Sequence, residues 1–395
     1  MAVAQKLKSF DIHAPNAREG AECLWAQMRE LDGLHHGVAS GGFHVAARYE
    51  DAMAVLLKPG LYASGAGITL PPPDGVRSFH IPAEIDPPAH REYRALMAAL
   101  LTANHARAME PDIRALVVDL IARIPAGESV DFVRAFARPL PILVTLALMG
   151  CPQGDADAVE QMVEDLHHEI GTGVATGAPA RLKAYAEQVV AERRKTATDP
   201  AADIVSSIVL GHAFGRPLTP DEQMSMVRQV LVGGFDTTSI ALATMMWWLA
   251  GHPDEVARLR GDPAAIELAC EEIVRFASPS TYLRREVTED TVLGGTLLAR
   301  GESVLVAFGA ANRDPAKFAC PEEIVATRKP NPHLGFGAGH HRCVGSFVAK
   351  AQLRVAFEEI LGAFAGFCLD TDQPIEHSTG LGQGIMRLPM IFTRA

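Results

Sequence analysis

Cysteine is scarce in this chain, and no two cysteines are closely spaced. Only six are present among 395 residues. Five of them are scattered singly: Cys23, Cys151, Cys270, Cys320 and Cys368. Single cysteines fit reduced thiols in a cytosol better than a disulfide framework, and we interpret these five as structural. Structural zinc sites and iron–sulfur clusters need several ligands at short spacing, so the pattern argues against both.

The sequence also lacks an apolar N-terminal stretch, an internal repeat and a low-complexity tract. We therefore expect neither a signal peptide nor a membrane anchor, and we predict a soluble, cytoplasmic protein. Because 48% of the residues are hydrophobic, the chain can bury a large core, and we predict a single domain over residues 1–395. The formal net charge of −11 argues against a general nucleic-acid binder.

Helical periodicity dominates the middle of the chain, roughly from residue 89 to residue 277. Strand-like segments lie early, at residues 42–48, and late, between residues 292 and 308, where glycines break them. The predicted fold class is therefore mainly α (α+β). We expect a large helical lobe and a smaller β-containing lobe.

The strongest helix signal begins at Thr219. Thr219 can cap the helix, Pro220 suits its first turn, and Glu222 completes a capping box. The pattern predicts a helix to about Ala250. Its middle, residues 233–238, contains two glycines and two threonines, which are poor helix formers, so we expect the hydrogen-bond ladder to loosen there.

The sixth cysteine, Cys343, lies in the glycine-rich segment Phe336–Gly345. Gly337 and Gly339 allow positive φ angles and a close approach of the backbone. An amphipathic helical pattern follows at about residues 346–362. Backbone amides directed at the sulfur would stabilise a thiolate there, beside a large flat cofactor.

A lone cysteine of this kind is usually a small buried hydrophobe, and the adjacent His340 and His341 could instead indicate zinc. The whole segment, however, resembles the cysteine-ligand loop of the cytochrome P-450 family. The resemblance implies that Cys343 is the axial thiolate of a haem b iron. It also implies that these residues of the loop lie around the cofactor: Phe336, Gly337, Gly339, His341 and Gly345.

Polar residues in the long helix match a second family motif. Asp236 and Thr237 stand between apolar stretches, where polar groups need partners or a task; otherwise they form a solvated turn. In the family resembled, the matching acid and alcohol help deliver protons to dioxygen. The resemblance implies that Thr237 hydrogen-bonds the oxygen or an ordered water, and that Asp236 relays protons from solvent.

Two further patterns agree with this resemblance. Glu272 and Arg275 match the family's Glu-x-x-Arg pair, for which a structural role is implied, with Arg328 as a third member. By themselves these two residues would be an ordinary surface pair. Haem carries two propionates, which need cationic or hydrogen-bonding partners. The residues that match such contacts are His90, Arg94, Arg285 and His341.

The function implied is that of a haem-thiolate monooxygenase with dioxygen as co-substrate. It would hydroxylate, epoxidise or O-dealkylate a small, mainly apolar molecule such as a terpenoid or an aromatic compound. Electrons would come from a ferredoxin, or from a flavodoxin, with its reductase, because the sequence shows no flavin or nucleotide domain. Such donors are acidic, so we expect a basic patch on the cysteine-loop face, with Arg91, Arg342 and Lys350 as candidates.

The substrate pocket gives weaker sequence signals. We expect residues 64–85 to form its roof and residues 171–177 to connect an access lid. The candidate lining residues are Val232, Gly233, Tyr282 and Leu381. Two alternatives remain: a hydrogen-peroxide-dependent peroxygenase, against which the Asp236–Thr237 pair counts, and a non-enzymatic haem-binding sensor, which would usually carry an output domain.

Overall fold

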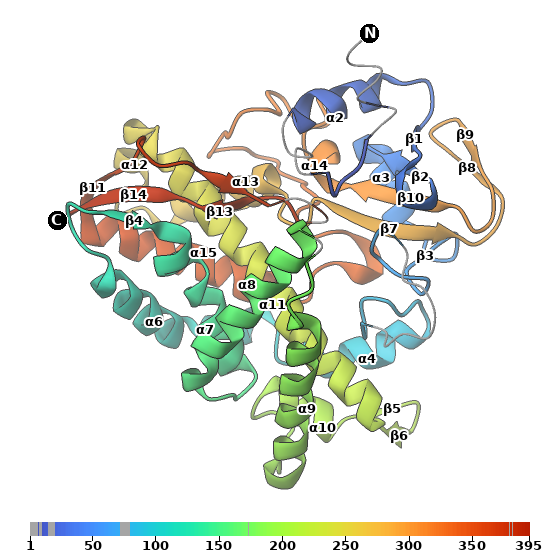
Figure 1. Cartoon of the computed structure of the whole chain (residues 1–395), viewed down its shortest axis with the longest axis horizontal. Helices are drawn as coiled ribbons and strands as arrows, with labels where there is room; N and C mark the ends of the chain where they lie inside the picture. The colour runs from blue at the N-terminus through green and yellow to red at the C-terminus, as the bar shows by residue number, and fades with distance from the viewer. Residues whose placement is uncertain are drawn as a thin grey trace.

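The computed structural model describes residues 7, 10–14, 20–71, 80–172, 174–378, 380 and 382–395 (Figure 1). Helices make up its larger lobe. They are α4 (Ala89–Ala98), α5 (Ala103–Ala108), α6 (Glu110–Arg123), α7 (Pro139–Leu148), α8 (Ala156–Thr172), α9 (Ala178–Thr196), α10 (Ile204–Val209), α11 (Pro220–Ala250), α12 (Pro253–Leu259), α13 (Pro263–Ala277) and α15 (Ser346–Ala363). The helical lobe expected from the sequence is therefore confirmed.

The smaller lobe is built on a five-stranded sheet in the order β1-β2-β10-β7-β3. Its strands are β1 (His35–Gly37), β2 (Phe43–Ala46), β10 (Ser303–Ala307), β7 (Tyr282–Val287) and β3 (Tyr62–Ala63). Strands β2 and β10 are parallel and the other pairs are antiparallel. The early and late strand segments of the sequence thus meet in one sheet, beside α2 (Ala21–Glu30), α3 (Tyr49–Leu57) and α14 (Phe308–Ala311) (Figure 1).

The remaining strands form small sheets. β11 (Phe364–Leu369), β14 (Pro389–Arg394) and β4 (Ser129–Asp131) make a three-stranded sheet that the sequence analysis did not predict. The other pairs are β8 (Thr291–Leu293) with β9 (Thr296–Leu298), β5 (His212–Ala213) with β6 (Arg216–Pro217), and β12 (Glu376–His377) with β13 (Ile385–Arg387). The β8–β9 hairpin turns at Gly294 and Gly295, as the sequence predicted.

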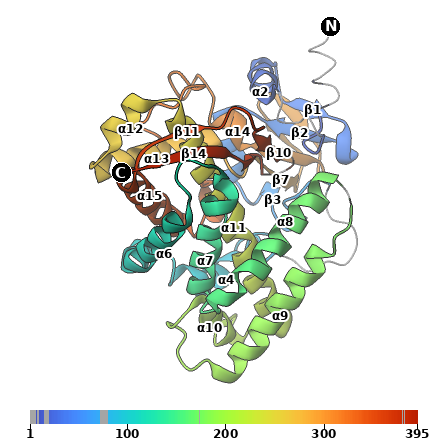
Figure 2. The same ribbon diagram turned by 60° about the vertical axis from the view of Figure 1, so that its left-hand side comes forward.

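Helix α11 crosses the middle of the helical lobe (Figures 1 and 2). The capping box between Thr219 and Glu222 is present, and the helix ends before Gly251, as predicted. The expected loosening at residues 233–238 is wrong, because α11 is α-helical throughout its 31 residues. A Cβ at Gly234 would lie 2.5 Å from Thr145 Oγ1 of α7, so the glycine is needed for close packing of two helices.

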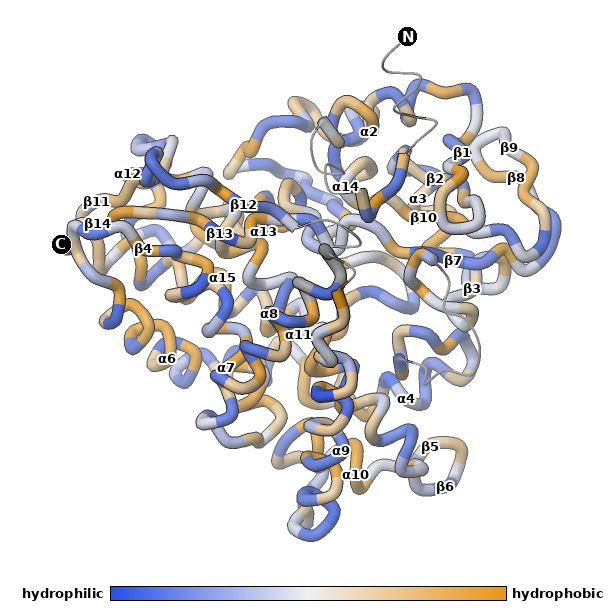
Figure 3. The backbone as a smooth tube through the Cα atoms, in the orientation of Figure 1, coloured by the Kyte–Doolittle hydropathy of each residue, from blue (hydrophilic) through white to orange (hydrophobic). Residues whose placement is uncertain are grey.

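Amphipathic helices complete the lobe, and α6, for example, packs against α15 and α7. On α6, the buried residues are Ile113, Val117, Leu120 and Ile121, spaced at one helical face. Figure 3 shows the resulting alternation of hydrophobic and hydrophilic residues along this helix. Among the described residues, α11 is the one helix long and apolar enough to cross a membrane, and 67% of its most apolar window is buried inside the protein.

Candidate active site

The glycine-rich segment forms a tight loop that presents Cys343 just before α15. The Cys343 amide donates to the Phe336 carbonyl oxygen at 2.8 Å, and the Gly337 amide donates to Leu334 at 2.8 Å. Gly337 and Gly339 have φ angles of 65° and 67°, which confirms the expectation of positive φ. A Cβ at Gly339 would lie 2.5 Å from the Leu56 carbonyl oxygen, so only glycine lets this loop lie against α3.

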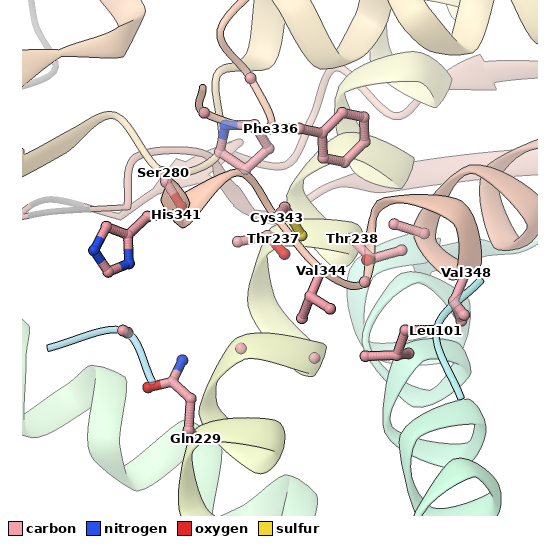
Figure 4. Close-up of a pocket in the computed structure, with 18 of the residues that line it drawn as sticks. Leu101, Gln229, Thr237, Thr238, Ser280, Phe336, His341, Cys343, Val344 and Val348 are labelled. Atoms are coloured by element: carbon pink, nitrogen blue, oxygen red, sulfur yellow. The ribbon is translucent and has the colours of Figure 1, made fainter. Parts of the chain in front are cut away.

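A cavity opens between this loop and α11 (Figure 4). Cys343 lines it together with the loop residues Phe336, Gly337, His341 and Gly345, whereas Gly339 does not. Burial by the surrounding protein raises the pKa of the Cys343 thiol. The Gly345 backbone amide and the positive charges of Arg94 and Arg342 oppose that effect, because they stabilise the thiolate. The sulfur is therefore set in a cavity with groups that favour its charged form.

Two arginines and two histidines line the same cavity: His90, Arg94, Arg285 and His341. Two come from α4, one from β7 and one from the cysteine loop. The rings of His90 and His341 are 4.5 Å apart, and His341 Nε2 lies 3.2 Å from Ser64 Oγ. Arg94 Nη2 donates to the Arg342 carbonyl oxygen at 2.5 Å. The fold thus gathers residues that are 251 positions apart in the sequence around one cavity.

None of these four groups forms an ion pair with a carboxylate among the described residues, and the nearby negative charge of Asp86 offsets the effect of burial on Arg285 and His90 only in part. Arg285 is 4% exposed, and burial lowers its pKa to about 10. Burial lowers the pKa of His341 to about 3, with a further contribution from the positive charge of Arg285, and that of His90 to about 4. Within the described residues, Arg285 makes one hydrogen bond, to the Arg284 carbonyl oxygen at 2.7 Å. The cluster is therefore suited to an anionic ligand.

The alternation of β7 decides which of its residues face the cavity. Leu283 and Arg285 line it, so their neighbours point to the other face of the sheet. Arg284 there donates to the Ala66 and Gly67 carbonyl oxygens. Tyr282 is fully buried elsewhere, where its hydroxyl accepts a 2.8 Å hydrogen bond from Trp25 Nε1. The prediction that Tyr282 lines the pocket is therefore wrong.

The other predicted pocket residues have mixed positions. Gly233 lines the cavity, whereas Val232 does not and is 39% exposed, because one step along α11 turns it away. Leu381 lies outside the described residues. The roof segment contributes Ile68, Pro82 and Ala83 to the cavity, but residues 72–79 lie outside the described part. The connection at residues 171–177 joins α8 to α9; Gly173 is not described, and none of the described residues there lines the cavity.

The acid and the alcohol of α11 differ in position. Thr237 lines the cavity, and its hydroxyl makes no hydrogen bond to any residue that the structure describes. Asp236 is partly buried and does not line the cavity. The sequence analysis missed Gln229, which also lines the cavity, two helical turns before Thr237. Its spacing from Gly233 and Thr237, four residues each time, was a signal that could have revealed it.

A second charged cluster lies on the cysteine-loop side, away from the cavity. Glu272 and Arg275 are joined by two hydrogen bonds of 2.9 and 2.8 Å, and both side chains are 0% exposed. Arg328 Nε lies 3.0 Å from both oxygens of Glu272. Arg275 also donates to backbone carbonyls of Asn312, Pro321 and Glu323. This network ties α13 to the segment that leads into the cysteine loop.

Comparisons with known proteins agree with this geometry. The family model described as Cytochrome P450 matches residues 174–263 and 265–390. The putative cytochrome P450 126 of Mycobacterium tuberculosis is 32% identical over 90% of this chain and 86% of that protein. The mycinamicin IV hydroxylase/epoxidase of Micromonospora griseorubida is 32% identical over 87% of this chain and 88% of its own. The solved structure of Mycobacterium marinum cytochrome P450 CYP268A2 in complex with pseudoionone has 27% identity, with 98% of each chain covered and a TM-score of 0.87.

The chain therefore belongs to the cytochrome P450 family and is an oxidoreductase of the monooxygenase type. The family implies a haem iron and dioxygen. The residues of the cavity fit that cofactor, because a thiol and an array of cations line one space. Among the described residues, His90 Nε2 is buried without a hydrogen-bond partner, and a cofactor propionate would satisfy it.

Proposed function

We propose that the protein binds haem b through Cys343 and inserts one oxygen atom of dioxygen into a small, mainly apolar molecule. The single observation that carries this proposal is the cavity in which the Cys343 thiol faces α11 at Thr237, with two arginines and two histidines in its wall. When bound, the haem supplies the reductive activation of dioxygen. The catalytic unit is one domain over residues 1–395, and we propose that it works in the cytoplasm.

The chain's own residues hold the cofactor and deliver protons. Cys343 would be the iron ligand, and the propionates would bind to His90, Arg94, Arg285 and His341. The Thr237 hydroxyl faces the cavity without a partner among the described residues, so it can hold a proton or an ordered water there. Asp236, one residue earlier and outside the cavity wall, would pass protons to it from the solvent side.

The lining residues favour an apolar substrate. The roof side of the cavity is formed by Ile68, Pro82 and Ala83. We propose a terpenoid or a small aromatic compound, which is supported by the solved relative that holds pseudoionone. Hydroxylation and epoxidation are both supported by the name of the mycinamicin relative, and O-dealkylation is a third outcome of the same chemistry.

A small ferredoxin, or a flavodoxin, with its reductase is the proposed electron donor. Arg91 and Arg342 are exposed and could meet an acidic partner. Lys350 is less suited, because its ammonium group pairs with Glu271 and lies over the Phe336 ring at 5.3 Å. Replacement of Arg342 by Glu should raise the KM for an acidic ferredoxin and weaken its salt dependence, and unchanged values would remove this residue from the docking surface.

The test of the haem-thiolate assignment is a carbon monoxide difference spectrum of the reduced protein. We expect the red-shifted Soret band of thiolate-ligated haem in the wild type and its loss in Cys343→Ser. Cys270→Ser is the matched control, because that cysteine is buried in the core and away from the cavity. A thiolate spectrum that persists in Cys343→Ser would contradict the ligand assignment.

A separate experiment addresses Thr237 and the peroxygenase alternative. We expect Thr237→Ala to keep haem but to divert reducing equivalents into hydrogen peroxide, because the hydroxyl that handles protons is gone. The measurement is product formed per NAD(P)H consumed, with hydrogen peroxide tested as the sole oxidant in parallel. Unchanged coupling would remove Thr237 from proton delivery, and efficient turnover on peroxide alone would favour the peroxygenase.

A further inference from the structure

Gln229 stands on the cavity face of α11. It precedes Gly233 by one helical turn and Thr237 by two, and all three line the cavity. Its amide nitrogen lies 3.5 Å from the place that a Cβ of Gly233 would occupy, so the side chain extends along the helix toward Gly233. Figure 4 shows Gln229 among the lining residues, on the same helix as Thr237.

The amide of Gln229 has no hydrogen bond to any residue that the structure describes. Gln223, on the same helix, provides a contrast, because it is bonded at both ends. Its Nε2 donates to the Val209 carbonyl oxygen at 3.0 Å, and its Oε1 accepts from Arg194 Nε at 2.8 Å. The Gln223 amide, which connects helices, is thus satisfied within the protein, whereas the Gln229 amide in the cavity has no hydrogen-bond partner for its donor or its acceptor among the described residues.

The missing hydrogen bonds of the Gln229 amide bear on which ligands the cavity can bind. The cavity that Gln229 lines is also lined by the apolar residues Ile68, Pro82 and Ala83, and an apolar ligand against Gln229 would take water from the amide without replacing its hydrogen bonds. A ligand that carries a hydroxyl or a carbonyl group would satisfy it. Such an unsatisfied amide would disfavour pure hydrocarbons relative to oxygenated ligands.

We propose that Gln229 is a specificity residue that binds a hydroxyl or carbonyl oxygen of the substrate, so that the substrate is an oxygenated, otherwise apolar molecule. The inference rests on the proposed monooxygenase function. Gln229 and Thr237 are eight residues apart, which is about 12 Å along an α-helix. Because the polar end of the substrate is held at Gln229, oxidation occurs at the end that is remote from the polar group.

The first test measures binding of two matched probes, geraniol and the hydrocarbon obtained when its hydroxyl is replaced by hydrogen. Dissociation constants are measured by calorimetry for the haem-loaded wild type and for Gln229→Leu. We expect the preference for the alcohol, expressed as the ratio of the two constants, to fall about five-fold in Gln229→Leu, the value of one net hydrogen bond. The ratio isolates the hydroxyl contact, because a general change in the cavity affects both probes.

The control is Gln188→Leu, which makes the same replacement at an exposed site on α9 outside the cavity. It should leave the ratio at the wild-type value. An unchanged ratio in Gln229→Leu, or a wild type that binds neither probe, would overturn the proposal. A carbon monoxide spectrum is recorded for every variant first. A wild type without the thiolate band contradicts the proposed function itself, whereas a normal band with an unchanged ratio contradicts only the role of Gln229.

The second test is the position of oxidation, which a merely structural residue would not control. Products of geraniol turnover are separated and identified for the wild type and for Gln229→Leu. We expect oxidation in the wild type at the carbons farthest from the hydroxyl, and a spread over several positions in the variant. Oxidation next to the hydroxyl in the wild type, or the same product distribution in both proteins, would overturn the proposed orientation.

Discussion

Two groups of ionisable residues, one around Glu272 and one around Arg285, differ in their partners. Around Glu272, one carboxylate binds two guanidinium groups, and Arg275 has further bonds to backbone carbonyls. Around Arg285, cations and imidazoles meet with no carboxylate in an ion pair among the described residues. We call these the closed network (Glu272, Arg275 and Arg328) and the open cluster (His90, Arg94, Arg285 and His341).

The difference distinguishes charges that hold the fold from charges that bind a ligand. Buried charge is costly unless it is paired and hydrogen-bonded. The closed network is balanced within the chain, so its members contribute to the folded protein alone. The open cluster leaves that cost uncompensated until an anion is bound, which is why burial shifts the pKa values of Arg285 and His341 downward. Haem propionates would supply the missing charge.

The largest effect is expected when the closed network is broken. Glu272→Gln removes the carboxylate and leaves two guanidinium groups buried without it, which should cost about 3–5 kcal/mol in the free energy of unfolding. The measurement is urea unfolding of the apoprotein and of the haem-loaded protein. Because the network does not touch the cavity, the loss should be similar in both forms.

Glu271→Gln is the control for this prediction. Glu271 is the adjacent residue, 25% exposed in its side chain, and pairs with His333 and Lys350. Its replacement should cost about 1 kcal/mol or less, as expected for a partly solvated pair. Equal losses in the two variants would show that the closed network is no more than a surface salt bridge.

The second-largest effect is expected for Arg285→Met, which should not weaken the apoprotein but should weaken haem binding. Arg285→Met removes a buried cation that forms no ion pair among the described residues, so the apoprotein should be as stable as the wild type or more stable. Haem affinity should fall on the order of 10- to 100-fold, because a charge-assisted hydrogen bond to a propionate is lost. Urea unfolding of the apoprotein and the rate of haem loss from the holoprotein give the two values.

The neighbouring residue provides the matched control. Arg284 lies on the opposite face of β7, and its guanidinium binds Ser303 Oγ at 2.7 Å and two backbone carbonyls. Arg284→Met should destabilise the apoprotein, because it leaves these acceptors unpaired. If Arg285→Met destabilised the apoprotein as much as Arg284→Met, the open cluster would be a structural feature and its assignment to haem would lose its physical basis.

Features that depend on neighbours in the chain could be predicted from the sequence, whereas features that depend on distant segments could not. Local patterns, such as the cap at Thr219 and the glycine-rich loop before Cys343, depend on neighbours in the chain, and they predicted the helix and the loop correctly. The face of β7 that lines the cavity is determined by the packing of the sheet, which has no local sequence signal. Tyr282 was therefore wrongly predicted to line the pocket. The pairing of β4 with β14 joins segments about 260 residues apart and has no local signal.

Helix α11 gives the same lesson at its middle. Its glycines predicted a loosened helix because propensity favours that outcome in isolation, yet contact with Thr145 on α7 makes the glycine a packing residue. The roles of the residues that face the cavity remain predictions. Gln229 could have been found only by following the helical period from Thr237, once the cavity face was known.

The smallest effect on the free energy of unfolding is expected at a third charged group, around Glu222. Its carboxylate is paired, as in the closed network, but the group lies near solvent. Glu222 at the start of α11 accepts from Arg216, Tyr93 and the Thr219 amide. Its hydrogen bond with Arg216 is the largest of the influences that lower the pKa of Glu222, to about 2. Glu222→Gln should cost only about 1 kcal/mol in unfolding free energy, because solvent and salt screen the ion pair between Glu222 and Arg216.

The pH dependence of this third group separates burial from partnering. A carboxyl whose pKa is lowered on folding stabilises the protein fully above its ordinary pKa, near 4.5, and loses that contribution as the pH falls toward 2. The difference in unfolding free energy between wild type and Glu222→Gln should therefore be constant from pH 7 to 5 and shrink below pH 4.5. At neutral pH it should also shrink in 1 M salt, whereas the loss in Glu272→Gln should hardly change, because water and ions do not reach a side chain with 0% exposure. Equal salt sensitivity of the two variants would mean that partners alone, and not burial, set the strength of these charged groups.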